Sequence, residues 1–280
     1  MNVKTFTALM FTCLFAAGQG PAWAAGPRVL SLSPCIDVIL VEVADRDQIA
    51  ALSHYARDPD SSTIAELART FPMTFESAEE VMSFTPELVL ASRHSAPATL
   101  NILRRVDIRT ELFDEPLAVA ESLAQVRRVA QLVGHPERGE VLVARIEAAI
   151  AAATPSESAP PVPAVIFQRN GFSPGTGTLL DELLRQTGFI NVAARYGPEW
   201  GNIPLEELIA GPPAVLLAGE IRPHMPTWAD RVLRHPALRR LEGRMTRASF
   251  PDRLLYCSGP VLIEAAATLA KARADVRPPP

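Results

Sequence analysis

The sequence contains the same pattern twice, once in each half of the chain. It reads EEVMSFTPELVLA at 79–91 and EELIAGPPAVLLA at 206–218. Each copy has two glutamates, two aliphatic residues, a three-residue spacer, a proline and a short apolar run. A residue that precedes proline avoids the helical conformation, so each copy predicts a short helix that ends there and leads into a buried strand. This pattern at equivalent places in both halves predicts two lobes built alike.

The rest of the chain alternates between short apolar runs and helical patterns, which is typical of α/β lobes with mostly parallel sheets. The expected strands and helices fall into two groups on either side of a long helical region. In the first group we expect strands at 28–32, 48–53, 88–91 and 106–113, and a helix at 36–43. In the second group we expect strands at 164–168, 216–218 and 254–257, and a helix at 177–187.

The long helical region lies at 117–154 and is interrupted only at Gly134-His135-Pro136. Its second helix is expected to run from 137 to 154. The stretch PSESAPP at 155–161 cannot continue a helix and is expected to join the lobes. The predicted organisation is therefore a first α/β lobe at 25–133, an inter-lobe helix and joint at 134–161, and a second α/β lobe at 162–276.

The N-terminus carries an export signal. A basic start at 1–4 precedes an apolar run at 5–17, and Ala22-Trp23-Ala24 matches the small-x-small pattern of signal-peptidase sites. The apolar run is shorter than the roughly 20 residues that a membrane span needs. We expect residues 1–24 to be a signal peptide, with a soluble periplasmic protein beginning near Ala25 and a disordered tail at 277–280. An anchored or buried helix is the alternative for the N-terminal run.

Composition excludes two classes of protein. The 280 residues are 48% hydrophobic and 21% charged, which argues against wholesale disorder, and the net charge of −4 provides no basic surface for nucleic acid.

The repeated pattern and the opening RVLSLSPC at 28–35 resemble the cobalamin and ferric-siderophore binding proteins of ABC importers. The resemblance runs over nearly the whole mature chain. It implies two Rossmann-like lobes joined by a long inter-lobe α-helix, with the ligand in the cleft between them. It also implies a monomer without a resident cofactor that carries a metal chelate, either a ferric siderophore or a corrinoid such as cobalamin. A haem-binding or free-metal-binding protein of the same fold is the alternative.

In this family one exposed glutamate per lobe docks onto arginines of the membrane permease dimer, and the matching residues are Glu79 and Glu206. Their neighbours Glu80 and Glu207 could share that role. A carboxylate at the same place in each lobe can engage both halves of a two-fold partner. Solvated acids on a helix face are the alternative.

Ligands of open α/β sheets lie beyond the carboxyl ends of the strands. Tyr55, Phe172 and Trp200 match positions where cobalamin-binding relatives place aromatic side chains against the ligand. Large, flat, partly apolar ligands suit aromatic walls, because aromatic side chains bury much area. The residues expected to line the cleft are Ser33, Pro34, Cys35, Tyr55, Arg93, His94, Arg169, Phe172, Trp200, Tyr256 and Cys257.

Charged side chains near these positions suggest further contacts. Guanidinium groups bind carboxylates and phosphates in a bidentate way, which would suit an anionic ferric siderophore or the carboxylates of haem. The histidines His54 and His94 could ligate a haem or corrinoid metal, or could be ordinary loop residues. The arginines that could face the cleft together are Arg57, Arg93, Arg169 and Arg253.

Removal of the leader would leave two cysteines, Cys35 and Cys257, one at each expected cleft edge. Three arrangements are open: a disulfide that ties the lobes and limits opening, two separate thiols, or two thiolates on a soft metal.

An enzyme is the main alternative class. The sequence has no G-x-S-x-G elbow, H-E-x-x-H helix, P-loop or G-x-G-x-x-G turn, and nothing nominates a nucleophile and base for a hydrolase. A structural or chaperone-like protein would not need symmetric docking acids. We therefore expect a binding protein.

Overall fold

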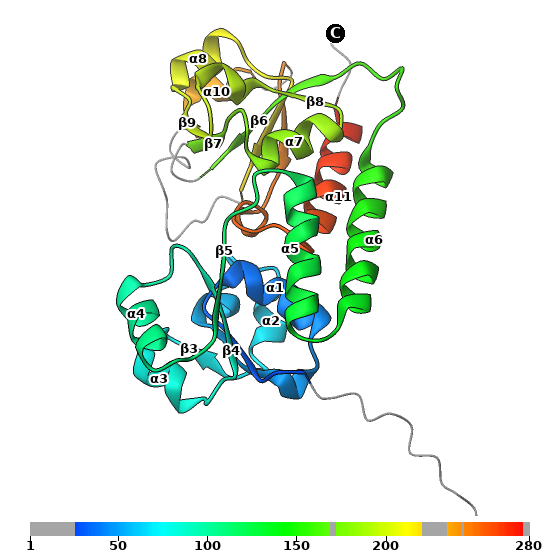
Figure 1. The fold of residues 1–280 in the computed structure, drawn as a ribbon. Helices are drawn as coiled ribbons and strands as arrows, with labels where there is room; N and C mark the ends of the chain where they lie inside the picture. The colour runs from blue at the N-terminus through cyan, green and yellow to red at the C-terminus, as the bar shows by residue number, and fades with distance from the viewer. Residues whose placement is uncertain (1–25, 169–171, 220–233, 242–243, 277–280) are drawn as a thin grey trace, which may run out of the picture.

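The computed structural model describes residues 26–168, 172–219, 234–241 and 244–276. The predicted signal peptide, the predicted tail and Arg169 lie outside the described residues. Figure 1 shows two α/β lobes, one above the other, with long helices along one side. The predicted fold class, α/β lobes with parallel central sheets, is confirmed.

The first lobe is built on a parallel sheet with the strand order β3-β2-β1-β4-β5. Its central strands are apolar and buried on both faces, as expected when helices cover both sides of a parallel sheet. The strands are β1 (Val29–Ser31), β2 (Ile49–Ser53), β3 (Met73–Thr74), β4 (Leu88–Ser92) and β5 (Thr110–Phe113). The helices are α1 (Pro34–Val43), α2 (Ala65–Ala68), α3 (Ala78–Ser83) and α4 (Pro97–Arg105).

The second lobe is built on a parallel sheet with the order β11-β10-β6-β8. A separate antiparallel pair, β7 with β9, lies beside it. The strands are β6 (Val162–Phe167), β7 (Phe172–Pro174), β8 (Phe189–Asn191), β9 (Trp200–Asn202), β10 (Val215–Ala218) and β11 (Thr246–Ser249). The helices are α7 (Leu179–Gln186), α8 (Leu205–Ala210) and α10 (Pro236–Arg239).

The two sheets share one topology. The order β2-β1-β4-β5 in the first lobe corresponds to β8-β6-β10-β11 in the second, and corresponding strands follow the same order along the chain. The repeated sequence pattern forms α3 and β4 in the first lobe and α8 and β10 in the second. The repeat therefore marks equivalent units of two similarly built lobes.

Three long helices connect the lobes: α5 (Val119–Leu132), α6 (Pro136–Ala153) and α11 (Val261–Ala274). Helix α6 packs against both α5 and α11, and it contacts α1 of the first lobe and α7 of the second. It occupies the region where the sequence predicts the inter-lobe helix. Gly134, with a φ of 85°, makes the turn between α5 and α6, and Pro136 begins α6.

A continuous cluster of buried apolar side chains runs through both lobes. It extends from Leu88 and Leu90 in the first sheet, through Val126 and Ile146 on the connecting helices, to Leu217 in the second sheet. Relative movement of lobes that share one core has to displace packed side chains. We therefore expect a stiff molecule with limited opening.

Two predicted strands are wrong in part or whole. Residues 254–257 form no strand: Leu254 ends a 3₁₀ turn at Asp252–Leu254, and the edge strand of this sheet is the more polar β11. Leu254 and Leu255 pack into the core without belonging to a sheet, so their apolar character reflects burial alone. The strand expected at 106–113 begins only at Thr110, because α4 ends at Arg105 and Asp107 adopts a left-handed turn conformation with a φ of 59°.

None of the described residues forms a helix with the length and apolar character that a membrane crossing requires.

Candidate functional site

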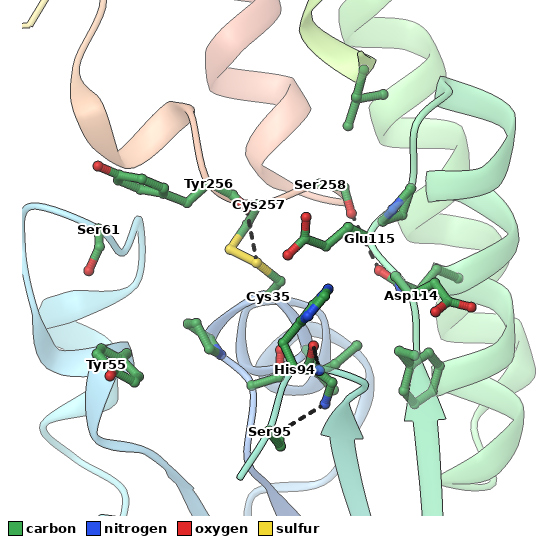
Figure 2. A pocket seen from close by; sticks show the side chains of 18 of the residues that line it. Cys35, Tyr55, Ser61, His94, Ser95, Asp114, Glu115, Tyr256, Cys257 and Ser258 are labelled. Carbon is green, nitrogen blue, oxygen red and sulfur yellow. Dashed lines mark hydrogen bonds between the residues drawn. A yellow bond between two sulfur atoms is a disulfide. The ribbon is translucent and has the colours of Figure 1, made fainter. Parts of the chain in front are cut away.

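A cavity of about 490 Å³ lies between the two lobes and is lined by residues from both. This volume falls within the range of about 300–1,000 Å³ that is usual for small-molecule sites. Figure 2 shows residues of both lobes around it. The predicted site residues that line it are Ser33, Pro34, Cys35, Tyr55, His94, Trp200, Tyr256 and Cys257.

The first lobe contributes to the cavity at the carboxyl ends of its strands. Ser33 follows β1, Tyr55 follows β2, Glu76 follows β3, His94 follows β4 and Asp114 follows β5. Loops at the carboxyl ends of parallel strands meet at one edge of the sheet, and this edge faces the second lobe.

The second lobe contributes three short segments. These are the start of α7 at 178–180, Trp200 at the start of β9, and residues 255–258 before α11. Thr178 caps α7 by accepting a hydrogen bond from the Asp181 backbone N–H at 3.1 Å. The cavity thus has one wall from each lobe, and Gln125 of the connecting helix α5 also lines it.

Cys35 and Cys257 form a disulfide, with their Cα atoms 4.9 Å apart. Cys35 lies in the first turn of α1 and Cys257 precedes α11, so the bond joins the two lobes within the wall of the cavity. Figure 2 shows the bond between Tyr256 and His94. Of the three arrangements that the sequence leaves open, the structure contains the disulfide.

Large aromatic side chains from both lobes stand partly exposed at the cavity. Tyr55 is 48% exposed, Trp200 is 42% exposed and Tyr256 is 54% exposed. Aromatic side chains that line a cavity from both sides offer apolar contact surface to a ligand. Phe172, on β7, is also exposed but does not line this cavity.

The three described arginines of the predicted set, Arg57, Arg93 and Arg253, do not line the cavity, and Arg169 lies outside the described residues. Arg57 donates to the backbone carbonyl of Phe71 at 2.6 Å, Arg93 pairs with Asp114, and Arg253 pairs with Glu264. These three bonds hold segments of the protein together. No arginine or lysine occurs among the described residues that line the cavity, whereas three acids, Glu76, Asp114 and Glu115, do.

The two histidines have different surroundings. His94 is exposed, lines the cavity and extends into it in Figure 2. The His54 ring contacts those of Tyr55 and Phe75, with centroids 3.9 Å and 5.1 Å away, and does not line the cavity. Groups of three or more His, Cys, Asp and Glu side chains that could hold a metal ion are absent from the described residues.

Sequence reasoning missed Glu76, which lines the cavity. Its carboxylate lies 3.8 Å from Nδ1 of His54. Partial burial raises the pKa of the Glu76 carboxyl above its usual range, and His54 partly offsets this effect. Glu76 follows the two-residue strand β3, which is too short to be recognised from a periodic pattern.

Asp37 is buried in α1 of the first lobe. Its Oδ2 accepts hydrogen bonds from the Ser53 hydroxyl at 2.6 Å and the Ser53 backbone N–H at 3.2 Å. Burial raises the pKa of Asp37 to about 8, against the opposing effect of these hydrogen bonds. Asp37 is therefore predominantly protonated at neutral pH.

The acids of the repeated pattern divide into two kinds. Glu80 accepts from the Phe75 backbone N–H at 2.7 Å, and Glu207 accepts from the Tyr196 hydroxyl at 3.1 Å. Glu79 and Glu206 are exposed, and their carboxylates make no hydrogen bond or ion pair with the described residues. The outer acid of each pair therefore faces solvent in both lobes.

Comparison with known proteins agrees with this architecture. A family model described as "Periplasmic binding protein" matches residues 29–243. A vitamin B12-binding protein of Salmonella typhi is 24% identical over 207 residues, which is 71% of this chain and 76% of the relative.

Solved structures show the same fold. The apo form of a periplasmic haem-binding protein of Roseiflexus sp. RS-1 has a TM-score of 0.66 at 24% identity, covering 88% of this chain and 99% of the other. The periplasmic vitamin B12-binding protein of Vibrio cholerae has a TM-score of 0.65 at 15% identity, covering 89% and 96%. These proteins are binding proteins. Because the family model matches most of its length, the chain belongs to the periplasmic binding protein family, the substrate-binding components of ABC importers.

Proposed function

We propose that this protein is an exported carrier that captures a metal chelate between its lobes and delivers it to an ABC permease in the inner membrane. The observation that carries the proposal is the cavity between the lobes, with aromatic side chains from both walls. A binding protein needs a site that two lobes enclose, and this cavity has that form.

The cargo that fits these walls best is a flat macrocycle with a central metal, either a corrinoid or haem. Tyr55, Trp200 and Tyr256 offer aromatic surface to such a ring, and the His94 imidazole can supply a metal ligand. Relatives of the chain bind vitamin B12 or haem, which supports this class. An anionic ferric siderophore has less support, because Arg57, Arg93 and Arg253 are held by other groups.

Delivery uses Glu79 and Glu206 as docking acids. They occupy equivalent helices, α3 and α8, which lie at opposite ends of the molecule, away from α6, in Figure 1. Both carboxylates are exposed, so they are available to arginines of a two-fold permease.

Export through a signal peptide at 1–24 would place the carrier in the periplasm as a soluble monomer. The Cys35–Cys257 disulfide supports this location, because such bonds persist in oxidising compartments.

Tryptophan fluorescence of the purified protein tests the proposal. The probes are cyanocobalamin, haemin, a ferric hydroxamate siderophore and ferric ion alone. We expect saturable quenching by a macrocyclic chelate, and loss of the Trp200 component of that signal in a Trp200→Phe variant, since Trp200 lines the cavity. Absence of binding to every probe, by fluorescence and by calorimetry, would overturn the proposal.

A further inference from the structure

Glu76 has a strained backbone at the edge of the cavity. Its φ is 70°, in the left-handed region that non-glycine residues seldom occupy. Two threonines hold this conformation: the Glu76 N–H donates to the Thr74 hydroxyl at 3.0 Å, and the Thr99 hydroxyl donates to the Glu76 carbonyl at 2.8 Å. Strain of this kind persists only where neighbours enforce it, and it gathers at ligand sites.

The side chain of Glu76 is also unusual. Its Oε1 is buried and accepts no hydrogen bond from the described residues. The nearest cationic candidate, Nδ1 of His54, is 3.8 Å away, beyond hydrogen-bond length, and is itself buried without a partner in the described part of the chain. A buried carboxylate oxygen without a donor is costly, so neighbouring donors gain most by binding this carboxylate. The other oxygen, Oε2, is not fully buried and accepts no hydrogen bond from the described residues, so it is the atom that a donor on a ligand can reach.

The surroundings fix where such a donor would lie. His54 contacts the rings of Tyr55 and Phe75, which favour its present position, with Nδ1 beyond hydrogen-bond length from Glu76. Tyr55 and Glu76 both line the cavity, and both lie next to His54, so the first-lobe wall offers an aromatic surface and a carboxylate on either side of one residue. A flat ring against Tyr55 would present its edge substituents to Glu76.

The acidic side chains of the cavity wall determine which edge groups of a ligand ring are favoured. Glu76, Asp114 and Glu115 line the cavity, and no lysine or arginine joins them among the described residues. Arg93 pairs with Asp114, Glu76 has only the His54 imidazole near it, and Glu115 makes no ion pair with the described residues. An ionised carboxylate accepts hydrogen bonds and donates none, so it attracts N–H groups and repels other carboxylates.

We propose that Glu76 is a specificity-determining residue that accepts hydrogen bonds from N–H groups at the edge of the cargo and disfavours cargo with carboxylates at that edge. This inference rests on the proposed function. Among metal macrocycles, corrinoids with peripheral carboxamides satisfy it, whereas haem, with two propionates, does not.

A matched pair of probes isolates the effect. Cobinamide and cobyrinic acid share the corrin ring and its cobalt, and they differ in bearing carboxamides or carboxylates around the ring. We expect the wild-type protein to bind cobinamide more tightly than cobyrinic acid or haemin in calorimetric titrations. Glu76→Gln should weaken cobinamide binding by about tenfold or more and reduce the preference over cobyrinic acid.

Two further variants complete the test. Glu66→Gln makes the same chemical change at an exposed acid on α2, outside the cavity, and should leave both affinities unchanged. Glu76→Asn is the second cavity variant, because asparagine tolerates the left-handed conformation, and it should act in the same direction as Glu76→Gln.

The outcomes separate the two proposals. An unchanged ratio of the two affinities in folded Glu76→Gln and Glu76→Asn would overturn the role of Glu76 while the carrier function stands. If the wild-type protein binds cobyrinic acid or haemin more tightly than cobinamide, the proposed role of Glu76 is overturned as well. Failure of the wild-type protein to bind any of these probes or a ferric siderophore would overturn the proposed function, and this inference with it.

Discussion

At the scale of single residues, the charge of the cavity comes from acids and not from the arginines that the sequence suggested. The sequence correctly draws attention to the strand ends that form the cavity, because the carboxyl ends of parallel strands meet at one edge. It does not reveal which side chains are already engaged. Arg57 looks like a cleft residue in the sequence but holds the Phe71 carbonyl, and Glu76 escapes notice although it lines the cavity.

The buried acid Asp37 gives a pH-dependent prediction. Its folded-state pKa of about 8 lies above the ordinary value of 3.8 for an aspartate, so the folded protein holds a proton that the unfolded chain releases. The stability contributed by this proton is complete below about pH 4 and is lost as the pH rises through 8. Asp37→Asn should remove this dependence, so that the variant gains stability relative to wild type as the pH rises.

Urea unfolding of both proteins at pH 4.5, 6.5 and 8.5 measures this difference. Parallel curves of unfolding free energy against pH would show that Asp37 is not protonated in the folded state.

At the scale of secondary-structure elements, the sequence predicts the helices and strands that have a periodic apolar pattern or that end at glycine or proline. Gly134 and Pro136 separate α5 from α6: Gly134 permits a left-handed turn, and Pro136 begins α6. Short edge elements carry no such signal. Strand β11 has the sequence TRAS, which is too polar to be recognised as a strand. Leu254 and Leu255 are buried in the core, and a short apolar run predicts a buried strand equally well whether or not the residues form one.

The disulfide between α1 and the segment before α11 gives a prediction at this scale. Replacing both cysteines, Cys35→Ser/Cys257→Ser, removes a cross-link that spans 222 residues and constrains the unfolded chain. We expect the unfolding free energy to fall by about 2–4 kcal/mol in guanidinium titrations.

Wild-type protein treated with a reductant should lose a comparable amount, while the double variant should not respond to the reductant. Equal stability of the oxidised wild type and the double variant would mean that the bond does not stabilise the fold.

At the scale of the whole molecule, two lobes with one topology are joined by three helices through a shared core. The similarity of the two lobes follows from the repeat in the sequence, whereas the three joining helices and the shared core do not. The cargo does not follow from it, because the lobes determine where a ligand lies and individual wall residues determine which ligand is held.

The repeat also predicts that the residues that deliver the cargo to the permease differ from the residues that bind it. Glu79→Ala/Glu206→Ala removes both exposed docking acids and should abolish uptake through the permease while leaving the affinity for cargo within about twofold of wild type, since neither residue lines the cavity. Uptake of a radiolabelled probe by cells that carry the permease measures delivery, and calorimetry measures affinity.

The control is Glu66→Ala/Glu147→Ala, which removes two exposed acids from other helices and should transport normally. Normal uptake by the Glu79→Ala/Glu206→Ala protein would refute docking through these acids.

If the cavity between the lobes holds the cargo, as we propose, a side chain that blocks the cavity should prevent binding. Ala96 lines the cavity and is exposed, so Ala96→Trp adds bulk there without disturbing the core. In calorimetric titrations with cyanocobalamin, cobinamide and haemin, we expect the wild-type protein to bind one macrocycle per chain. The variant should lose at least about tenfold in affinity while its melting temperature stays unchanged. Equal binding of a macrocycle by both proteins would place the cargo site elsewhere and contradict the claim.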